Sequence, residues 1–162
     1  MTIDVTEIGT FADRTVRAFT LRNGNGISAT VVEHGARIVS VSVPNLSNTK
    51  ADVVPAAADL AGYAGAFASF GAICGRFANR IDAGRLHLDG TTHQLALSEG
   101  AAHHLHGGPQ GFHRRLWQGE TEAESVTFRL SSVDGDQGYP GALDAEAVYA
   151  LGDDDRLTCT LR

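Results

Sequence analysis

The feature that most limits the fold is a series of short alternating segments separated by polar turns. The clearest turn is Asn23-Gly24-Asn25-Gly26, because Asn and Gly tolerate the positive φ angles of a tight hairpin. It separates two strand candidates, residues 15–22 and 27–33. In a third candidate, residues 37–43, valine and serine alternate, which is typical of a strand with two different faces.

The second half of the chain continues the pattern. Nineteen glycines and only four prolines fit many short turns between strands better than a helical bundle. The segment before residue 75 is instead expected to contain a short helix, with Asp59 as its N-cap. The glycines that follow disfavour a long helix. We therefore predict an all-β fold, an antiparallel β-sandwich. The further strand-forming segments are residues 85–97 (a hairpin), 125–131, 143–151 and 156–162.

Charge and composition exclude several classes of partner. The chain has 162 residues, enough for one domain, and a formal net charge of −6, which argues against binding to nucleic acid or to an anionic membrane. The most apolar stretch, residues 60–74, is too short to span a bilayer. Cys74 and Cys159 lie far apart, so we expect two small buried hydrophobes in a reducing compartment, and hence a cytoplasmic protein.

The histidines raise the question of a metal. On a strand, His104 and His106 would point to the same side, as in the metal-binding pair of a cupin-type β-barrel. Such a pair needs a further ligand, but Gln110 stands where a carboxylate would be expected, and the next acid is Glu120. We predict no metal and no cofactor, keep a metal-dependent barrel as an alternative, and interpret His103 and His104 as surface or turn residues.

Three polar residues are better candidates for binding. Asn79 and Arg80 place an amide beside a guanidinium, a combination of donors and acceptors that suits sugar hydroxyls. His106 precedes a Gly-Gly-Pro turn that lets a ligand approach the backbone closely. Asn79, Arg80 and His106 are therefore predicted to converge on one polar cleft. Arg76 is as well explained as a surface arginine that pairs with an acid.

Other motifs argue against several chemistries. The loop at residues 134–141 resembles a calcium loop, but Tyr139 stands where the EF-hand requires glycine, and Ala145 where it requires an acid. We interpret it as a rigid surface loop. Tyr139 and Trp117 are expected in the core more than against a sugar. The chain contains no Gly-x-Ser-x-Gly, P-loop or dinucleotide fingerprint, and no spacing indicates a pair of catalytic carboxylates.

Several ordered motifs together resemble the aldose 1-epimerase (galactose mutarotase) family. They include Gly75-Arg76-Phe77-Ala78-Asn79-Arg80-Ile81, Leu105-His106-Gly107-Gly108 and Gly138-Tyr139-Pro140-Gly141. One departure is His103, where the family commonly has Asn. The resemblance implies a galactose mutarotase-like β-sandwich that interconverts the α and β anomers of aldohexoses such as galactose and glucose. It also implies that the residues aligning with Asn79, Arg80 and His106 contact the sugar.

The resemblance further implies catalysis by a glutamate base and a histidine acid, without metal or cofactor. The family's histidine motif, Asn-His-x-Tyr-Phe-Asn, does not occur in this chain. We therefore expect residues 1–162 to be the N-terminal part of one such domain, an incomplete sandwich without catalytic residues and inactive alone. An open sheet edge is expected to favour self-association. A carbohydrate-binding β-sandwich without catalysis is the other alternative.

Overall fold

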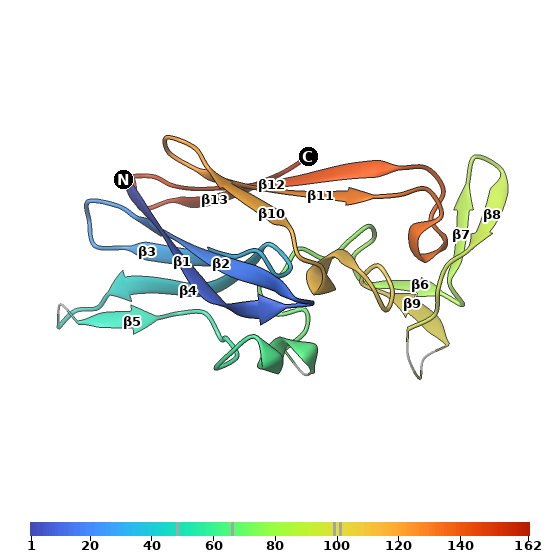
Figure 1. Cartoon of the computed structure of the whole chain (residues 1–162), viewed down its shortest axis with the longest axis horizontal. Helices are drawn as coiled ribbons and strands as arrows, with labels where there is room; N and C mark the ends of the chain where they lie inside the picture. Colours follow the sequence, from blue (N-terminus) through green and yellow to red (C-terminus); the bar gives the residue numbers. More distant parts are fainter. Residues whose placement is uncertain (48, 66, 99, 101) are drawn as a thin grey trace.

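Two antiparallel sheets face each other in the computed structural model, which describes residues 1–162 except 48, 66, 99 and 101 (Figure 1). The larger sheet has the strand order β1 (Thr2–Phe11), β2 (Arg14–Arg22), β3 (Ser28–Val32), β4 (Arg37–Pro44) and β5 (Lys50–Asp52). The second sheet has the order β10 (Gln118–Thr121), β11 (Val126–Ser132), β12 (Leu143–Leu151) and β13 (Leu157–Leu161).

The hydrophobic core fills the space between these two sheets. The ring of Phe19 on β2 meets that of Phe128 on β11 edge to face, with centroids 5.3 Å apart. Trp117, just before β10, is fully buried, and its indole N–H donates to the carbonyl of Phe112 at 3.1 Å. Apolar side chains from both sheets thus share one core. The prediction of an all-β antiparallel sandwich is confirmed, as is the core position expected for Trp117.

The predicted hairpin turn forms for a visible reason. The side-chain oxygen of Asn23 accepts hydrogen bonds from the backbone N–H groups of Asn25 (3.2 Å) and Ile27 (2.9 Å), as Asn does in many turns. Its amide nitrogen donates to the Asp155 carboxylate at 2.7 Å. One side chain therefore closes the β2–β3 turn and ties it to the β12–β13 turn of the other sheet.

Most predicted strands are confirmed, and the differences lie at sheet edges. β1 was not predicted, because it is an edge strand whose side chains are nearly all exposed and show little apolar alternation. β5 and β10 were missed as well. The predicted short helix is present as η1 (Ala61–Ala64), but its N-cap is Leu60 and not Asp59; the Asp59 carboxylate, one residue earlier, accepts from the N–H of Gly62 at 3.0 Å. The buried position expected for Cys159 is wrong, because this residue is exposed on the edge strand β13.

Two small ladders extend from the sandwich at one end of the molecule (Figure 1). β7 (Arg85–Leu88) and β8 (Thr91–Gln94) form the hairpin predicted within residues 85–97. β6 (Arg80–Asp82) pairs with β9 (His103–Leu105). The remaining short elements are η2 (Phe112–Arg114) and η3 (Asp136–Gly138). No helix in the described part of the chain is long and apolar enough to cross a membrane.

A buried arginine joins the irregular segments to the larger sheet. Arg37, the first residue of β4, has 0% exposed surface, and its guanidinium lies over the ring of Tyr63, 4.0 Å from the centroid. Burial lowers the pKa of Arg37 to about 10, so the group is still charged at neutral pH. Its nitrogens donate to the backbone carbonyls of His34, Phe67, Ala68, Phe70 and His113.

Two histidines beside this arginine are buried without a charge. Burial, together with the positive charge of neighbouring arginines, lowers the pKa of His34 and of His113 to about 4 in each case. The Nδ1 atom of each ring has no hydrogen-bond partner among the described residues. Both rings are therefore neutral near pH 7, and protonating either one places a cation close to the guanidinium of Arg37.

We predict that Arg37→Met destabilises the fold by about 3 kcal/mol or more, because it leaves five carbonyl oxygens without their donor. Urea unfolding followed by Trp117 fluorescence measures the change. The matched control is Arg22→Met, which removes an exposed ion pair with Asp4 and should cost no more than about 1 kcal/mol. Equal stabilities of the two variants would contradict the assigned role of Arg37.

We also predict that stability falls as the pH is lowered from 7 to 5. Unfolded histidine has a pKa of about 6.5, so in this interval the unfolded chain binds more protons than the folded chain, and acid favours unfolding. Urea unfolding at several pH values tests this. The dependence should weaken in His34→Leu and persist in His87→Gln, which changes an exposed histidine on β7. A pH dependence that is unaltered by His34→Leu would contradict the assignment.

Candidate functional site

The β6–β9 ladder brings the two predicted binding motifs together. Its register pairs Arg80 with Leu105 and Asp82 with His103. Asn79 directly precedes β6 and His106 directly follows β9, so both lie at the same end of the ladder. Residues that are separated by more than twenty positions in the sequence therefore become neighbours through antiparallel pairing.

Asn79, Arg80 and His106 are linked by hydrogen bonds. The backbone N–H of Asn79 donates to Nδ1 of His106, and the backbone N–H of His106 donates to the carbonyl of Asn79, both at 3.0 Å. The Arg80 guanidinium donates to the side-chain oxygen of Asn79 at 3.3 Å. The three residues are thus neighbours, as predicted, and they are exposed or half-buried. That they line a polar cleft stays a prediction.

These contacts fix the chemical state of His106. Because its Nδ1 accepts a hydrogen bond, the neutral ring carries its proton on Nε2. Burial, and then the charge of Arg80, lowers the pKa of His106. The ring is therefore a neutral N–H donor at pH 7. The positive φ angles of Asn79 (68°) and His106 (50°) turn the backbone out of the ladder at this point.

The structure adds His103 to this group. Its Nε2 atom accepts a hydrogen bond from Nε of Arg80 at 3.0 Å. His103 is half-buried on β9, so its interpretation as a surface or turn residue missed the contact with Arg80. The sequence signal that could have found it is its position three residues before His106, opposite the Asn-Arg pair across a short ladder.

The surface position expected for His104 is wrong. This side chain has 0% exposed surface, because it occupies the inward face of β9. Its Nδ1 lies 2.6 Å from the carbonyl of Ala96, and its Nε2 lies 2.6 Å from the hydroxyl of Tyr139. Both ring nitrogens are thus engaged, and His106 turns out of the strand. The metal-binding alternative based on His104 and His106 gains no support from this arrangement. Tyr139 is buried, as expected.

Among the described residues, Arg76 forms no salt bridge with an acid. Its guanidinium donates to the hydroxyl and carbonyl of Ser132 and to the carbonyls of Val133, Pro140 and Gly141. These acceptors lie on both sides of η3, within and beside the segment 134–141 that is predicted to be a rigid surface loop. Arg76 therefore holds this loop against the Gly-Arg segment that leads to Asn79, and its role in the structure is to support the site.

The glycines of the second motif allow a close approach of the two motif backbones. Gly107 has a φ of 85°, and a Cβ at this position would collide with the carbonyl oxygen of Gly75. The first and second motifs are therefore in direct backbone contact. Any larger residue at position 107 would separate them and displace His106 from Asn79.

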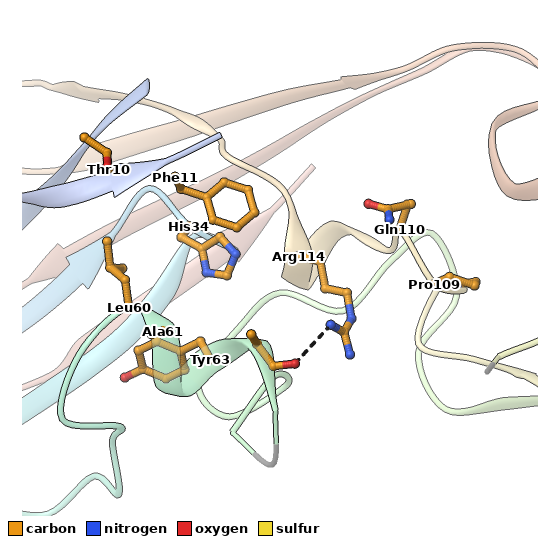
Figure 2. A pocket seen from close by; sticks show the side chains of 10 residues that line it. Thr10, Phe11, His34, Leu60, Ala61, Tyr63, Pro109, Gln110 and Arg114 are labelled. Carbon is orange, nitrogen blue, oxygen red and sulfur yellow. Dashed lines mark hydrogen bonds between the residues drawn. The ribbon is translucent and has the colours of Figure 1, made fainter. Parts of the chain in front are cut away.

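Two pockets lie near the cluster. One has a volume of about 530 Å³ and is lined by residues around Leu105, Gly108 and His113. The other, of about 330 Å³, is shown in Figure 2, where the ring of His34 lies beneath Phe11 and the side chain of Arg114 lines another part of the wall. Neither pocket is lined by Asn79, Arg80 or His106. The cluster thus forms an exposed polar surface beside these hollows.

Comparison with known proteins gives a consistent result. The family model described as aldose 1-epimerase matches residues 17–162. Aldose 1-epimerase from Escherichia coli (strain K12) is 41% identical over 147 residues, which are 90% of this chain and 42% of that protein. Galactose mutarotase from Bos taurus is 36% identical over 137 residues, which are 85% of this chain and 40% of that protein.

The folds agree as well. The crystal structure of galactose 1-epimerase from Lactobacillus acidophilus NCFM superposes with a TM-score of 0.83 and 26% sequence identity, covering 99% of this chain and 47% of that one. The chain thus spans about two fifths of the length of the curated relatives that it matches. On the match of residues 17–162, the chain belongs to the aldose 1-epimerase family.

Proposed function

We propose that this chain supplies the sugar-binding side of an aldose 1-epimerase site, which interconverts the α and β anomers of aldohexoses such as galactose and glucose. The observation that carries the proposal is the hydrogen-bonded cluster of Asn79, Arg80 and His106. The names of the relatives, aldose 1-epimerase and galactose mutarotase, support the reaction and the class of substrate.

The chemistry of the cluster suits a neutral polyol. A sugar offers hydroxyl and ring oxygens, which need directional donors and acceptors and no net charge. Arg80 uses its Nε on His103 and one terminal nitrogen on Asn79, so further guanidinium N–H groups remain for a ligand. The neutral His106 contributes an N–H donor at Nε2. Together they can hold one oxygen-rich face of a pyranose.

Anomer interconversion needs a base that takes the proton of the anomeric hydroxyl and an acid that protonates the ring oxygen. The ring opens, the C1–C2 bond rotates, and the ring closes on its other face. His106 can donate a proton, but its ring accepts from the N–H of Asn79, and no carboxylate among the described residues is hydrogen-bonded to it. We therefore assign binding, and no catalytic role, to Asn79, Arg80 and His106.

Three further expectations accompany this proposal. We expect residues 1–162 to form the N-terminal part of one larger mutarotase-like sandwich, which the partial coverage of the relatives supports. β13 is the last strand of its sheet, and its exposed Leu161 favours self-association along this edge. A cytoplasmic location is expected from the free cysteines Cys74 and Cys159.

We predict that Arg80→Met weakens galactose binding about tenfold or more, because charged hydrogen bonds to the sugar are lost. Titration followed by NMR chemical shifts measures the affinity. The matched control is Arg85→Met, an exposed arginine on the neighbouring strand β7, which should bind galactose like the unchanged chain. If galactose binding were weakened equally in both variants, the effect would come from the loss of net positive charge, and the assignment of Arg80 to the sugar site would be contradicted.

We predict that the chain does not measurably accelerate the mutarotation of freshly dissolved α-galactose in polarimetry. Each positioned proton-transfer group contributes about 10²–10⁴-fold, and the family's acid motif is absent from this sequence. The comparison is with buffer and with His106→Ala. Galactose binding without acceleration would also fit the non-catalytic carbohydrate-binding alternative. A high rate that is lost in His106→Ala would show that His106 is catalytic.

A further inference from the structure

We infer that His103 is a positioning residue, whose neutral ring orients the Arg80 guanidinium and makes sugar binding at this cluster sensitive to pH. The inference rests on the proposed sugar site and deepens it, because it assigns a role to a residue outside the set of Asn79, Arg80 and His106. It also concerns the position at which this chain departs from the asparagine that the family commonly has.

The geometry around Arg80 carries the first step. Two acceptors hold its guanidinium, Nε2 of His103 on Nε at 3.0 Å and the side-chain oxygen of Asn79 on a terminal nitrogen at 3.3 Å. Two hydrogen bonds from different nitrogens fix the orientation of the planar Arg80 guanidinium. An arginine on an exposed strand otherwise keeps considerable rotamer freedom, which binding would have to remove. His103 therefore prepares Arg80 for its ligand.

The protonation state of His103 carries the second step. Its Nε2 can accept from Arg80 only when this nitrogen holds no proton, so the neutral ring carries its proton on Nδ1. His106 shows the opposite arrangement, with an acceptor at Nδ1. A protonated His103 would have no free lone pair and would place a second cation 3.0 Å from Arg80. A proton on Nε2 would therefore break the contact.

Among the described residues, the titratable and charged groups near His103 come from the two strands of the ladder and from the residue that follows β9. Arg80 and Asp82 lie on β6, with Asp82 directly opposite His103 in the register, and His106 follows β9. The Asp82 carboxylate is almost fully exposed and lies 3.8 Å from Arg85, so solvent screens its charge. Arg80 is thus the group that responds most directly to a proton on His103.

The first test needs no sugar. Multiple-bond ¹H–¹⁵N NMR spectra at pH 7.5 report the tautomer of each imidazole, and His103→Asn identifies the signals of residue 103. We expect the Nδ1–H tautomer for His103, together with slow exchange of the Arg80 Nε–H, which becomes faster in His103→Leu. An Nε2–H tautomer, or exchange unaltered by His103→Leu, would overturn the positioning role.

The second test measures galactose affinity at pH 7.5 and pH 5.5 for the unchanged chain, His103→Asn and His103→Leu, with folding confirmed from amide spectra. We expect His103→Leu to bind about five- to tenfold more weakly at pH 7.5, and His103→Asn to bind within about twofold of the unchanged chain. His106 is common to all three, so the difference between their pH profiles reports residue 103.

We expect acid to weaken binding less in His103→Asn, because an amide oxygen accepts from Arg80 at either pH. Identical pH profiles in the unchanged chain and His103→Asn would overturn the pH sensitivity. If the unchanged chain binds no galactose at either pH, the proposed function fails. The tautomer and exchange measurements then still decide whether His103 positions Arg80.

Discussion

The guanidinium of Arg37 makes the irregular part of this sandwich possible. The segment between β5 and β6 and the segment around η2 have little regular structure, so many of their carbonyl groups lack ladder partners. Burying such groups unpaired is costly. From a strand of the larger sheet, Arg37 donates to four of these carbonyls and also to the carbonyl of His34, between β3 and β4. These loops are thereby fixed to the scaffold, although the regular structure of their described residues consists of the short 3₁₀ helices η1 and η2.

Two other arginines repeat this arrangement closer to the cluster. Arg76 binds carbonyl groups on both sides of η3, and Arg115 pairs with Asp136 at 2.6 Å within the same loop. The hydrogen bond from Arg115 is the largest cause of the lowered pKa of Asp136. Loops that carry binding residues need such support, since a small displacement at the site costs binding energy. The positions of Asn79, Arg80 and His106 thus depend on the partly buried side chains of Arg76 and Arg115.

The sequence predicts the sandwich but only part of the cluster. Alternating residues and the Asn23 turn predict the central strands, because these strands bury one face and their turns need special backbone angles. β6 and β9 are three residues long and too short to show alternation, so their register was not predictable. The meeting of Asn79 with His106 was expected from their chemistry and the family resemblance. The burial of His104 was missed because its partners, Ala96 and Tyr139, are brought to it by folding.

The neutral state of the histidines connects stability with binding. His34 and His113 stay uncharged because they are buried near Arg37, and the pKa of His106 is lowered by burial and by Arg80. Each protonation would place a new cation near an arginine that already organises the structure. Acid therefore acts against the core and against the binding cluster by the same electrostatic mechanism. The chain has a net charge of −6, so the positive charge of Arg37 and of Arg80 is a local feature. Arg37 binds the loops that lead to the proposed sugar site, and Arg80 belongs to that site.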